Sequence, residues 1–121
     1  MSRTVLTVDD SKTMRDMVAF TLKQAGFEVK MAEDGNDALV VLGDEAVDCI
    51  VTDLNMPGMD GLQLIRELRA HPVHRVTPIL MLTTESDEAK KQEGRDAGAT
   101  GWLVKPFNPD KLIHTINRVT Q

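Results

Sequence analysis

The chain has 121 residues, 41% of them hydrophobic, which predicts one domain around one core. Its net charge of −5, the lack of a Lys/Arg cluster and an aromatic content of 3% argue against direct nucleic-acid binding. No apolar run is long enough to span a bilayer, and the N-terminal apolar residues meet Asp9 too soon for a signal peptide. We therefore expect a soluble, cytoplasmic, monomeric protein, with residues 1–121 forming a single domain and no output domain.

Five short apolar segments have the length and composition of buried strands. The second is more mixed in character, which favours an edge position in a sheet. The third is the most hydrophobic, which favours the centre. The predicted strands are residues 4–8, 27–32, 48–53, 78–82 and 100–104.

Helical periodicity fills the intervals between these strands and the segment after the last one. Ser11 and Asn108 can cap the first and last helices, and Gly26 and Gly43 can end the first two. The fourth helix is predicted to begin at Ser86. It carries almost no large apolar residue, so we expect it to be the least firmly packed.

The alternation of five strands with five helices predicts the fold class. Strands that alternate with helices form a parallel sheet covered on both faces, which is a three-layer, doubly wound α/β sandwich. In such folds the functional groups lie beyond the carboxyl ends of the strands.

Four of the predicted strands end in polar side chains that this fold would bring to one edge: Asp9-Asp10, Asp53, Thr83 and Lys105. At an effective dielectric constant near 20, two carboxylates about 4 Å apart repel by about 4 kcal/mol, which a divalent cation such as Mg²⁺ would offset. A cation, an ammonium group and a hydroxyl donor together are what phosphoryl transfer requires. One of the carboxylates could then act as the nucleophile and form an acyl phosphate.

These residues, together with the loop Met56-Pro57-Gly58-Met59-Asp60-Gly61 and with Lys105-Pro106, resemble the receiver domains of two-component response regulators. The resemblance runs from Thr4 to the last helix, and Asn55 and Glu85 make it greatest with the stand-alone chemotaxis type, the CheY type. It implies a flavodoxin-like sheet with strand order 2-1-3-4-5, which is also the known order in CheY.

The resemblance also implies a role for each residue at the strand ends. Asp53 would accept a phosphoryl group from the phosphohistidine of a partner histidine kinase of the CheA type. Asp10 and Asp53 would bind Mg²⁺ directly, Asn55 through its backbone carbonyl and Asp9 chiefly through water. Lys105 would pair with the Asp53 carboxylate or with its phosphate.

The same resemblance implies a switch. Thr83 would move toward the phosphoryl group, and an aromatic residue of the fifth strand would turn into the vacated space. The family usually has Tyr or Phe there, whereas this chain has Trp102, whose larger indole only donates a hydrogen bond. Asn55 and Glu85 would tune self-dephosphorylation, and the Lys105–Pro106 bond would be cis.

The expected output face consists of the fourth helix, the fifth strand and the fifth helix. Its predicted reader is the flagellar motor switch protein or another phosphorylation-dependent target, and a phosphatase is a possible further partner. Residues expected on this face are Glu88, Lys91, Trp102, Val104, Phe107, Lys111 and Thr115.

Two other functions fit the same residues. A phosphorelay intermediate would pass its phosphoryl group to a second histidine protein. A Mg²⁺-dependent phosphohydrolase with an aspartyl nucleophile is disfavoured, because the chain has no cap region and no room for a substrate pocket. We therefore expect no enzyme activity beyond the chain's own phosphorylation and autodephosphorylation.

Several residue types that can carry chemistry are interpreted as structural. The single cysteine, Cys49, lies in an apolar strand and is expected to be a small buried side chain. Three methionines are expected in the core and three histidines on the surface: Met14, Met17 and Met31, and His71, His74 and His114.

Overall fold

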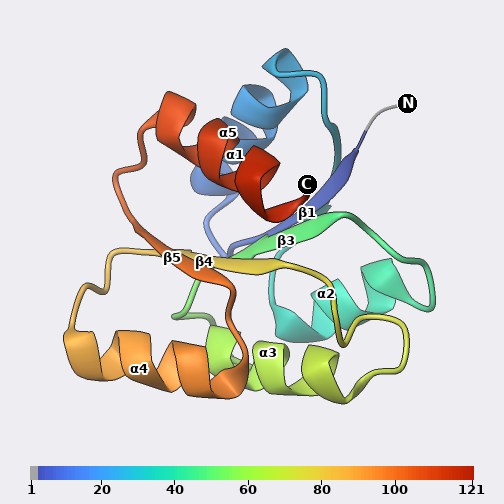
Figure 1. Ribbon diagram of the computed structural model, residues 1–121, viewed down its shortest axis with the longest axis vertical. Helices are drawn as coiled ribbons and strands as arrows, with labels where there is room; N and C mark the ends of the chain where they lie inside the picture. The colour runs from blue at the N-terminus through green and yellow to red at the C-terminus, as the bar shows by residue number, and fades with distance from the viewer. Residues whose placement is uncertain (1–2) are drawn as a thin grey trace.

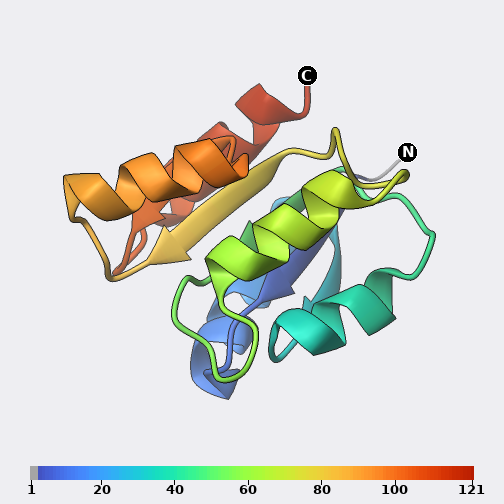
Figure 2. The ribbon, with the colours of Figure 1, turned by 90° about the horizontal axis from the view of Figure 1, so that it is seen from below.

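A computed structural model describes residues 3–121 as one parallel five-stranded sheet, in the order β2-β1-β3-β4-β5, between two layers of helices (Figures 1 and 2). Helices α1 and α5 cover one face, and α2, α3 and α4 cover the other. The predicted fold class and strand order are therefore confirmed. The strands are β1 Thr4–Val8, β2 Glu28–Ala32, β3 Cys49–Thr52, β4 Ile79–Thr83 and β5 Gly101–Val104. The helices are α1 Lys12–Gln24, α2 Gly35–Leu42, α3 Gly61–Ala70, α4 Glu88–Ala97 and α5 Pro109–Val119.

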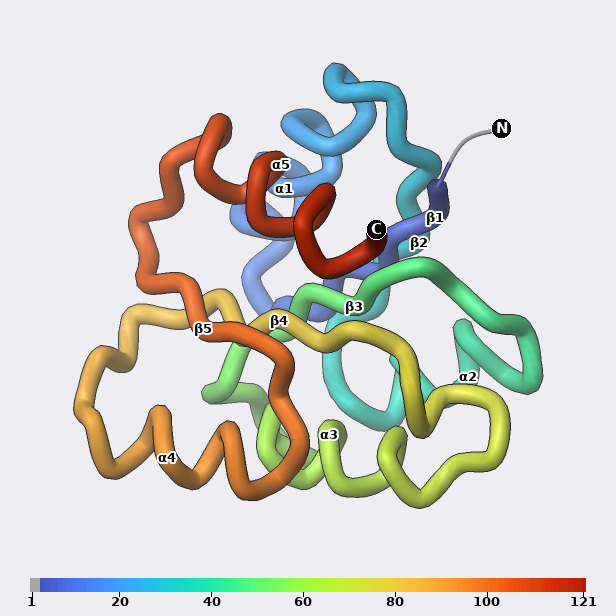
Figure 3. Tube along the Cα trace, in the orientation of Figure 1, coloured from blue at the N-terminus to red at the C-terminus, as the bar shows by residue number. Residues whose placement is uncertain are grey.

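The sheet separates two hydrophobic cores, because successive strand residues point to opposite faces. Val5 packs toward α1 and α5, whereas its neighbour Leu6 packs toward α2 and α3. In β3, Ile50 likewise packs toward α2 and α3, and its neighbour Val51 packs toward α1 and α5. The Cα trace in Figure 3 shows β3 near the middle of the molecule. Because both faces are covered, β1, β3 and β4 are buried along almost their whole length.

Each helix is preceded by a cap residue whose side chain accepts a hydrogen bond from a backbone N–H of the first turn. The caps predicted at Ser11 and Asn108 are confirmed. The predicted start of α4 at Ser86 is wrong by two residues, because Asp87 accepts from the N–H of Ala89 and is the cap. Within residues 3–121, no helix combines the length and the apolar content that crossing a membrane would require.

Helix α4 buries only Gly94 and Ala97, so it contributes no large apolar side chain to the core. Helices α1 and α5 each bury larger residues, such as Leu22 and Ile116. The expectation that α4 is the least firmly packed helix agrees with this difference. A helix held by so little apolar area can move at modest free-energy cost.

Three of the structural interpretations were wrong. Met17 and Met31 are largely exposed, because Met17 lies at the margin of the apolar stripe of α1 and Met31 lies on edge strand β2. His74 is buried in the loop between α3 and β4, where its Nε2 lies 2.9 Å from the carbonyl of Gly43.

Cys49 is fully buried in β3, and this burial raises the pKa of its thiol to about 12. Because the thiolate is the reactive species, we expect the native protein to resist alkylation by iodoacetamide at pH 8. Unfolding in guanidinium chloride should expose the thiol and give one alkylated cysteine, as measured by mass spectrometry. Rapid alkylation of the native chain would contradict this burial.

Candidate functional site

The predicted site residues follow directly on the carboxyl ends of the strands, and backbone hydrogen bonds extend the sheet to reach them. The N–H of Asp53 donates to the carbonyl of Val8, and the N–H of Asp9 donates to the carbonyl of Ala32. The N–H of Lys105 likewise donates to the carbonyl of Thr83 at 2.8 Å. The sheet therefore fixes the positions from which these side chains project.

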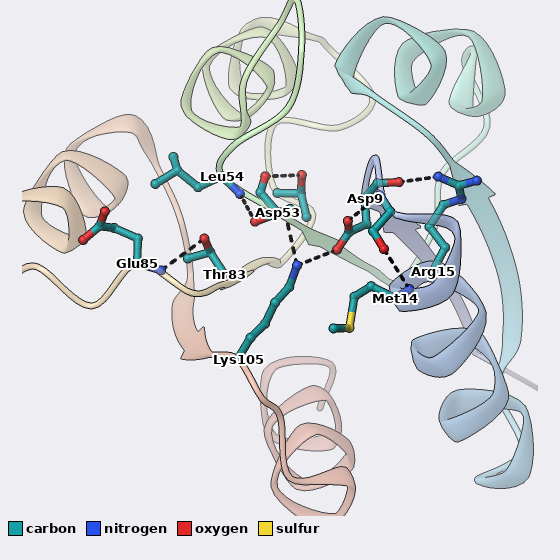
Figure 4. A network of polar contacts seen from close by, with 10 residues as sticks. Asp9, Met14, Arg15, Asp53, Leu54, Thr83, Glu85 and Lys105 are labelled. Atoms are coloured by element: carbon teal, nitrogen blue, oxygen red, sulfur yellow. Dashed lines mark hydrogen bonds and ion pairs between the residues drawn. The ribbon is translucent and has the colours of Figure 1, made fainter.

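The ammonium group of Lys105 lies between two carboxylates (Figure 4). Its Nζ is 2.8 Å from Oδ2 of Asp9 and 3.2 Å from Oδ2 of Asp53. The three side chains are only 11%, 5% and 11% exposed, respectively, so solvent screens these ion pairs weakly. Burial lowers the pKa of Lys105, but the hydrogen bond that Lys105 donates to Asp9 and the charges of both carboxylates outweigh it and leave the pKa raised.

The second oxygens of the two buried carboxylates accept backbone hydrogen bonds. Oδ1 of Asp9 accepts from the N–H of Ser11 at 2.9 Å, and Oδ1 of Asp53 accepts from the N–H of Leu54 at 2.8 Å. Asp10 is exposed beside them. These contacts fix the orientation of Asp9 and Asp53 before any ligand binds.

Asp9, Asp10 and Asp53 form a group that fits a magnesium ion. One ligand oxygen from each lies within 4.8 Å of the others, and hard carboxylate oxygens are the ligands that Mg²⁺ prefers. The group has three carboxylates and one ammonium neighbour, so a dication would offset the remaining negative charge. Asp10 and Asn55 also line one open hollow, which leaves the edge of the group accessible to solvent.

Thr83 and Trp102 both contact Glu85 in the loop before α4. The buried Thr83 hydroxyl accepts a hydrogen bond from the N–H of Glu85 at 3.3 Å. The Nε1–H of the half-buried Trp102 donates to the carbonyl of Glu85 at 2.8 Å. The Glu85 carboxylate accepts from the N–H of Asp87. Glu85 thus connects the two predicted switch residues through its backbone.

Three supporting contacts were not predicted from the sequence. The shorter ion pair of Lys105 is with Asp9 rather than Asp53. Arg15 donates from Nη1 to the carbonyl of Asp9 at 2.6 Å, and the i, i+6 spacing of these residues gives no signal for that contact. A Cβ on Gly61 would collide with the carbonyl of Asp53, so α3 approaches the site this closely only with glycine there.

Five of the predicted output residues line two small hollows. Lys91 and Trp102 line one between α4 and β5. Val104, Phe107 and Lys111 line the other, where β5 leads into α5. The exposed Glu88 reaches this surface through its ion pair with Lys91 at 3.7 Å. The lysines and the indole give the surface a mixed basic and apolar character. The Lys105–Pro106 peptide bond, directly after β5, is cis, as the resemblance implied.

A sequence model of the family described as response regulator receiver domain matches residues 5–117. The chain belongs to this family. Among solved structures, a chemotaxis protein CheY4 of Vibrio cholerae is 50% identical, with a TM-score of 0.94 over 98% of this chain and 99% of that one. A putative response regulator from Chloroflexus aurantiacus is 37% identical, with a TM-score of 0.94 over 99% and 98% of the two chains. A Francisella response regulator receiver domain is 31% identical, with a TM-score of 0.90 over 98% and 97%.

Membership of the receiver family confirms the resemblance on which the residue roles were based. Receiver domains generally bind Mg²⁺ at an acidic pocket, and this chain has a cluster of three aspartates, Asp9, Asp10 and Asp53, at the edge of its sheet. The individual roles of the residues at the strand ends, of the switch residues, of Asn55 and Glu85 and of the output face stay predictions.

Proposed function

We propose that this receiver domain accepts a phosphoryl group on Asp53 from the phosphohistidine of a histidine kinase. The observation that carries the proposal is the position of the Asp53 carboxylate. It is buried and fixed by Lys105 and by the N–H of Leu54, and its neighbours Asp9 and Asp10 bring ligand oxygens within 4.8 Å. Family membership over residues 5–117 supports the same conclusion.

In the proposed transfer, an oxygen of Asp53 attacks phosphorus, a P–O bond forms, and the P–N bond of phosphohistidine breaks. The imidazole leaves with the electron pair of that bond and takes up a proton. Lys105 neutralises charge on the acceptor carboxylate and on the incoming phosphoryl oxygens. Mg²⁺, held by Asp9, Asp10, Asp53 and the Asn55 carbonyl, would supply further charge neutralisation.

The acyl phosphate is then hydrolysed by water, which breaks the P–O bond to Asp53 and releases inorganic phosphate. Asn55 and Glu85, which border the site, set the rate of this step in the proposal. In this proposal, the chain catalyses only its own phosphorylation and dephosphorylation.

A phosphoryl group adds about −1.5 to −2 charges and new hydrogen-bond acceptors at the edge of the sheet. In the proposal, the Thr83 hydroxyl turns to this group, and the change reaches Trp102 and the surface formed by α4, β5 and α5. The similarity to a chemotaxis CheY4 protein favours a target in flagellar motor control, with a kinase of the CheA type as the phosphodonor.

The proposal is tested by incubating the protein with radiolabelled acetyl phosphate in the presence of Mg²⁺. We expect acid-stable, alkali-labile label in the wild-type protein and in Asp96→Asn, which alters an exposed carboxylate of α4. Asp53→Asn, or EDTA, should reduce the label to background, because the variant lacks the nucleophile and the chelator removes the neutralising cation. Undiminished label in Asp53→Asn would place the acceptor elsewhere.

The same preparation separates this function from a phosphohydrolase. With p-nitrophenyl phosphate as substrate, we expect no turnover faster than the decay of the acyl phosphate. Sustained rapid turnover would contradict the receiver function and would mean that the chain is a phosphohydrolase with an aspartyl nucleophile.

A further inference from the structure

Gly94, in the middle of α4, lies directly against the indole of Trp102. A Cβ built on Gly94 would be 2.7 Å from Cζ3 and 3.1 Å from Cε3 of the ring. The obstructing atoms belong to a rigid bicyclic ring and not to the end of a flexible side chain. No other residue at position 94 is therefore compatible with this position of the indole.

Nothing in the helix itself favours glycine at this position. Glycine is the least favourable residue in a helix interior apart from proline, and α4 is otherwise composed mainly of good helix formers. Its backbone dihedral φ is not positive, so no left-handed conformation requires glycine here. The close approach of Trp102 supplies the physical reason for Gly94.

The opposite side of the indole fixes the loop before α4. Its Nε1–H donates to the carbonyl of Glu85 at 2.8 Å, and the N–H of Glu85 donates to the hydroxyl of Thr83 at 3.3 Å. Figure 4 shows Thr83 beside Lys105 and Asp53, with Glu85 bound to it. A continuous set of contacts thus joins the middle of α4 to the edge of the sheet where Asp53 lies.

We propose that Gly94 is a positioning residue for the response to phosphorylation: its missing side chain makes room for Trp102, whose indole fixes the loop that carries Glu85. Through Glu85, the indole sets where the Thr83 hydroxyl can reach. The inference rests on the proposed function, because it assigns Gly94 a part in the phosphorylation-dependent switch. It differs from a switch in which the aromatic ring alone moves. Here the ring can hold its position only while residue 94 of α4, packed against it, has no side chain.

Intrinsic fluorescence reports the position of the ring directly. Trp102 is the only tryptophan and the chain has no tyrosine, so the emission comes from this indole alone. Gly94→Ala should shift the emission to longer wavelength and increase its quenching by iodide, because the added methyl group displaces the ring into solvent. Lys90→Ala, at an exposed position of the same helix, should change neither quantity. Unchanged emission in Gly94→Ala would overturn the proposal.

A double-mutant cycle separates the indole contact from helix propensity. In the wild-type background, Gly94→Ala should raise the equilibrium constant for unfolding, because the clash outweighs the gain in propensity. In a Trp102→Ala background, the same substitution should lower that constant about fivefold, as expected for glycine to alanine in a helix interior once the ring no longer obstructs the methyl group. An effect of the same sign in both backgrounds would contradict the close packing of residue 94 against the ring.

Titration with beryllofluoride in the presence of Mg²⁺ tests the effect on the phosphorylation site. Beryllofluoride bound at Asp53 mimics the phosphoryl group, and we expect Gly94→Ala to weaken its apparent affinity about tenfold, with Lys90→Ala unchanged. A general loss of stability would not by itself move this midpoint while the variant remains folded. Equal midpoints in Gly94→Ala and wild type would overturn the role of Gly94 alone. The absence of any response in wild type would overturn the proposed function, and the role of Gly94 with it.

Discussion

Replacement of Arg69 by alanine is expected to lower the free energy of unfolding by about 3 kcal/mol, a large part of the stability of a domain of this size. The guanidinium group donates from Nε and Nη2 to the carbonyl of Gly98, at 3.0 and 2.9 Å. Its Nη1 donates to the carbonyls of His74, Arg75 and Thr77. One side chain of α3 therefore holds both the loop before β4 and the loop before β5.

The loss should be large because the carbonyls of Gly98, His74 and Thr77 are bound at part-buried positions, where water replaces the lost donors incompletely. The guanidinium group is partly buried where most of these hydrogen bonds form, and this burial lowers the pKa of Arg69. Arg69→Lys should recover little of the lost stability, since a single ammonium group cannot span carbonyls from two loops. Urea unfolding followed by circular dichroism measures both variants.

Arg66→Ala is the matched control, because Arg66 is exposed on the same helix. We expect it to change the free energy of unfolding by less than about 0.5 kcal/mol. If Arg69→Ala were no more destabilising than Arg66→Ala, the hydrogen bonds to Gly98 and Thr77 would contribute nothing measurable.

Arg69 also illustrates which features the sequence could not reveal. Periodicity and strand composition predicted the fold class, the caps Ser11 and Asn108 and the edge at which Asp53 and Lys105 meet, because these depend on local patterns and on a fold with few alternatives. The strand order came from the resemblance to receiver domains. A contact such as Arg69 to Gly98 joins a residue of α3 to the loop after α4, 29 positions away, and no local pattern encodes it.

The errors have the same origin. His74 resembles a surface residue in composition, but the loop folds it against Gly43, where it is buried. Ser86 and Asp87 are both good caps, and only the hydrogen bond from Ala89 decides between them. The strand-end argument placed Asp9, Asp53 and Lys105 together, but it could not determine that Asp9 makes the shorter ion pair.

Lys105→Met is expected to lower the free energy of unfolding by about 3 kcal/mol in the absence of Mg²⁺. The substitution keeps most of the side-chain volume but removes the positive charge from between the buried side chains of Asp9 and Asp53. Two buried carboxylates would then face each other with Asp10 nearby. Added Mg²⁺ should recover part of the loss, because a ligand that binds only the folded state stabilises it by mass action.

The destabilisation should depend on pH in a defined direction. Desolvation lowers the pKa of Lys105, but the hydrogen bond that Lys105 donates to Asp9 and the carboxylate charges outweigh it, so the pKa is raised above its ordinary value of 10.5 in the folded protein. A group with a raised pKa contributes its full stabilisation below the unfolded-state pKa and loses it as the pH rises through the folded-state value. The difference between wild type and Lys105→Met should therefore be constant from pH 7 to about pH 10 and should decrease above it.

A second substitution distinguishes lost charge from lost packing. Asp9→Asn removes one of the two carboxylates, so it should be less harmful in the Lys105→Met background than in wild type, where it leaves Lys105 with one partner fewer. Lys23→Met, at an exposed position of α1, controls for the loss of one positive charge and should have little effect. Equal effects of Asp9→Asn in both backgrounds would mean that the ammonium group does not stabilise this pair of carboxylates. If Asp9→Asn is less harmful in the Lys105→Met background, then Lys105 is the residue that holds the Asp9 and Asp53 carboxylates close together in one acceptor site.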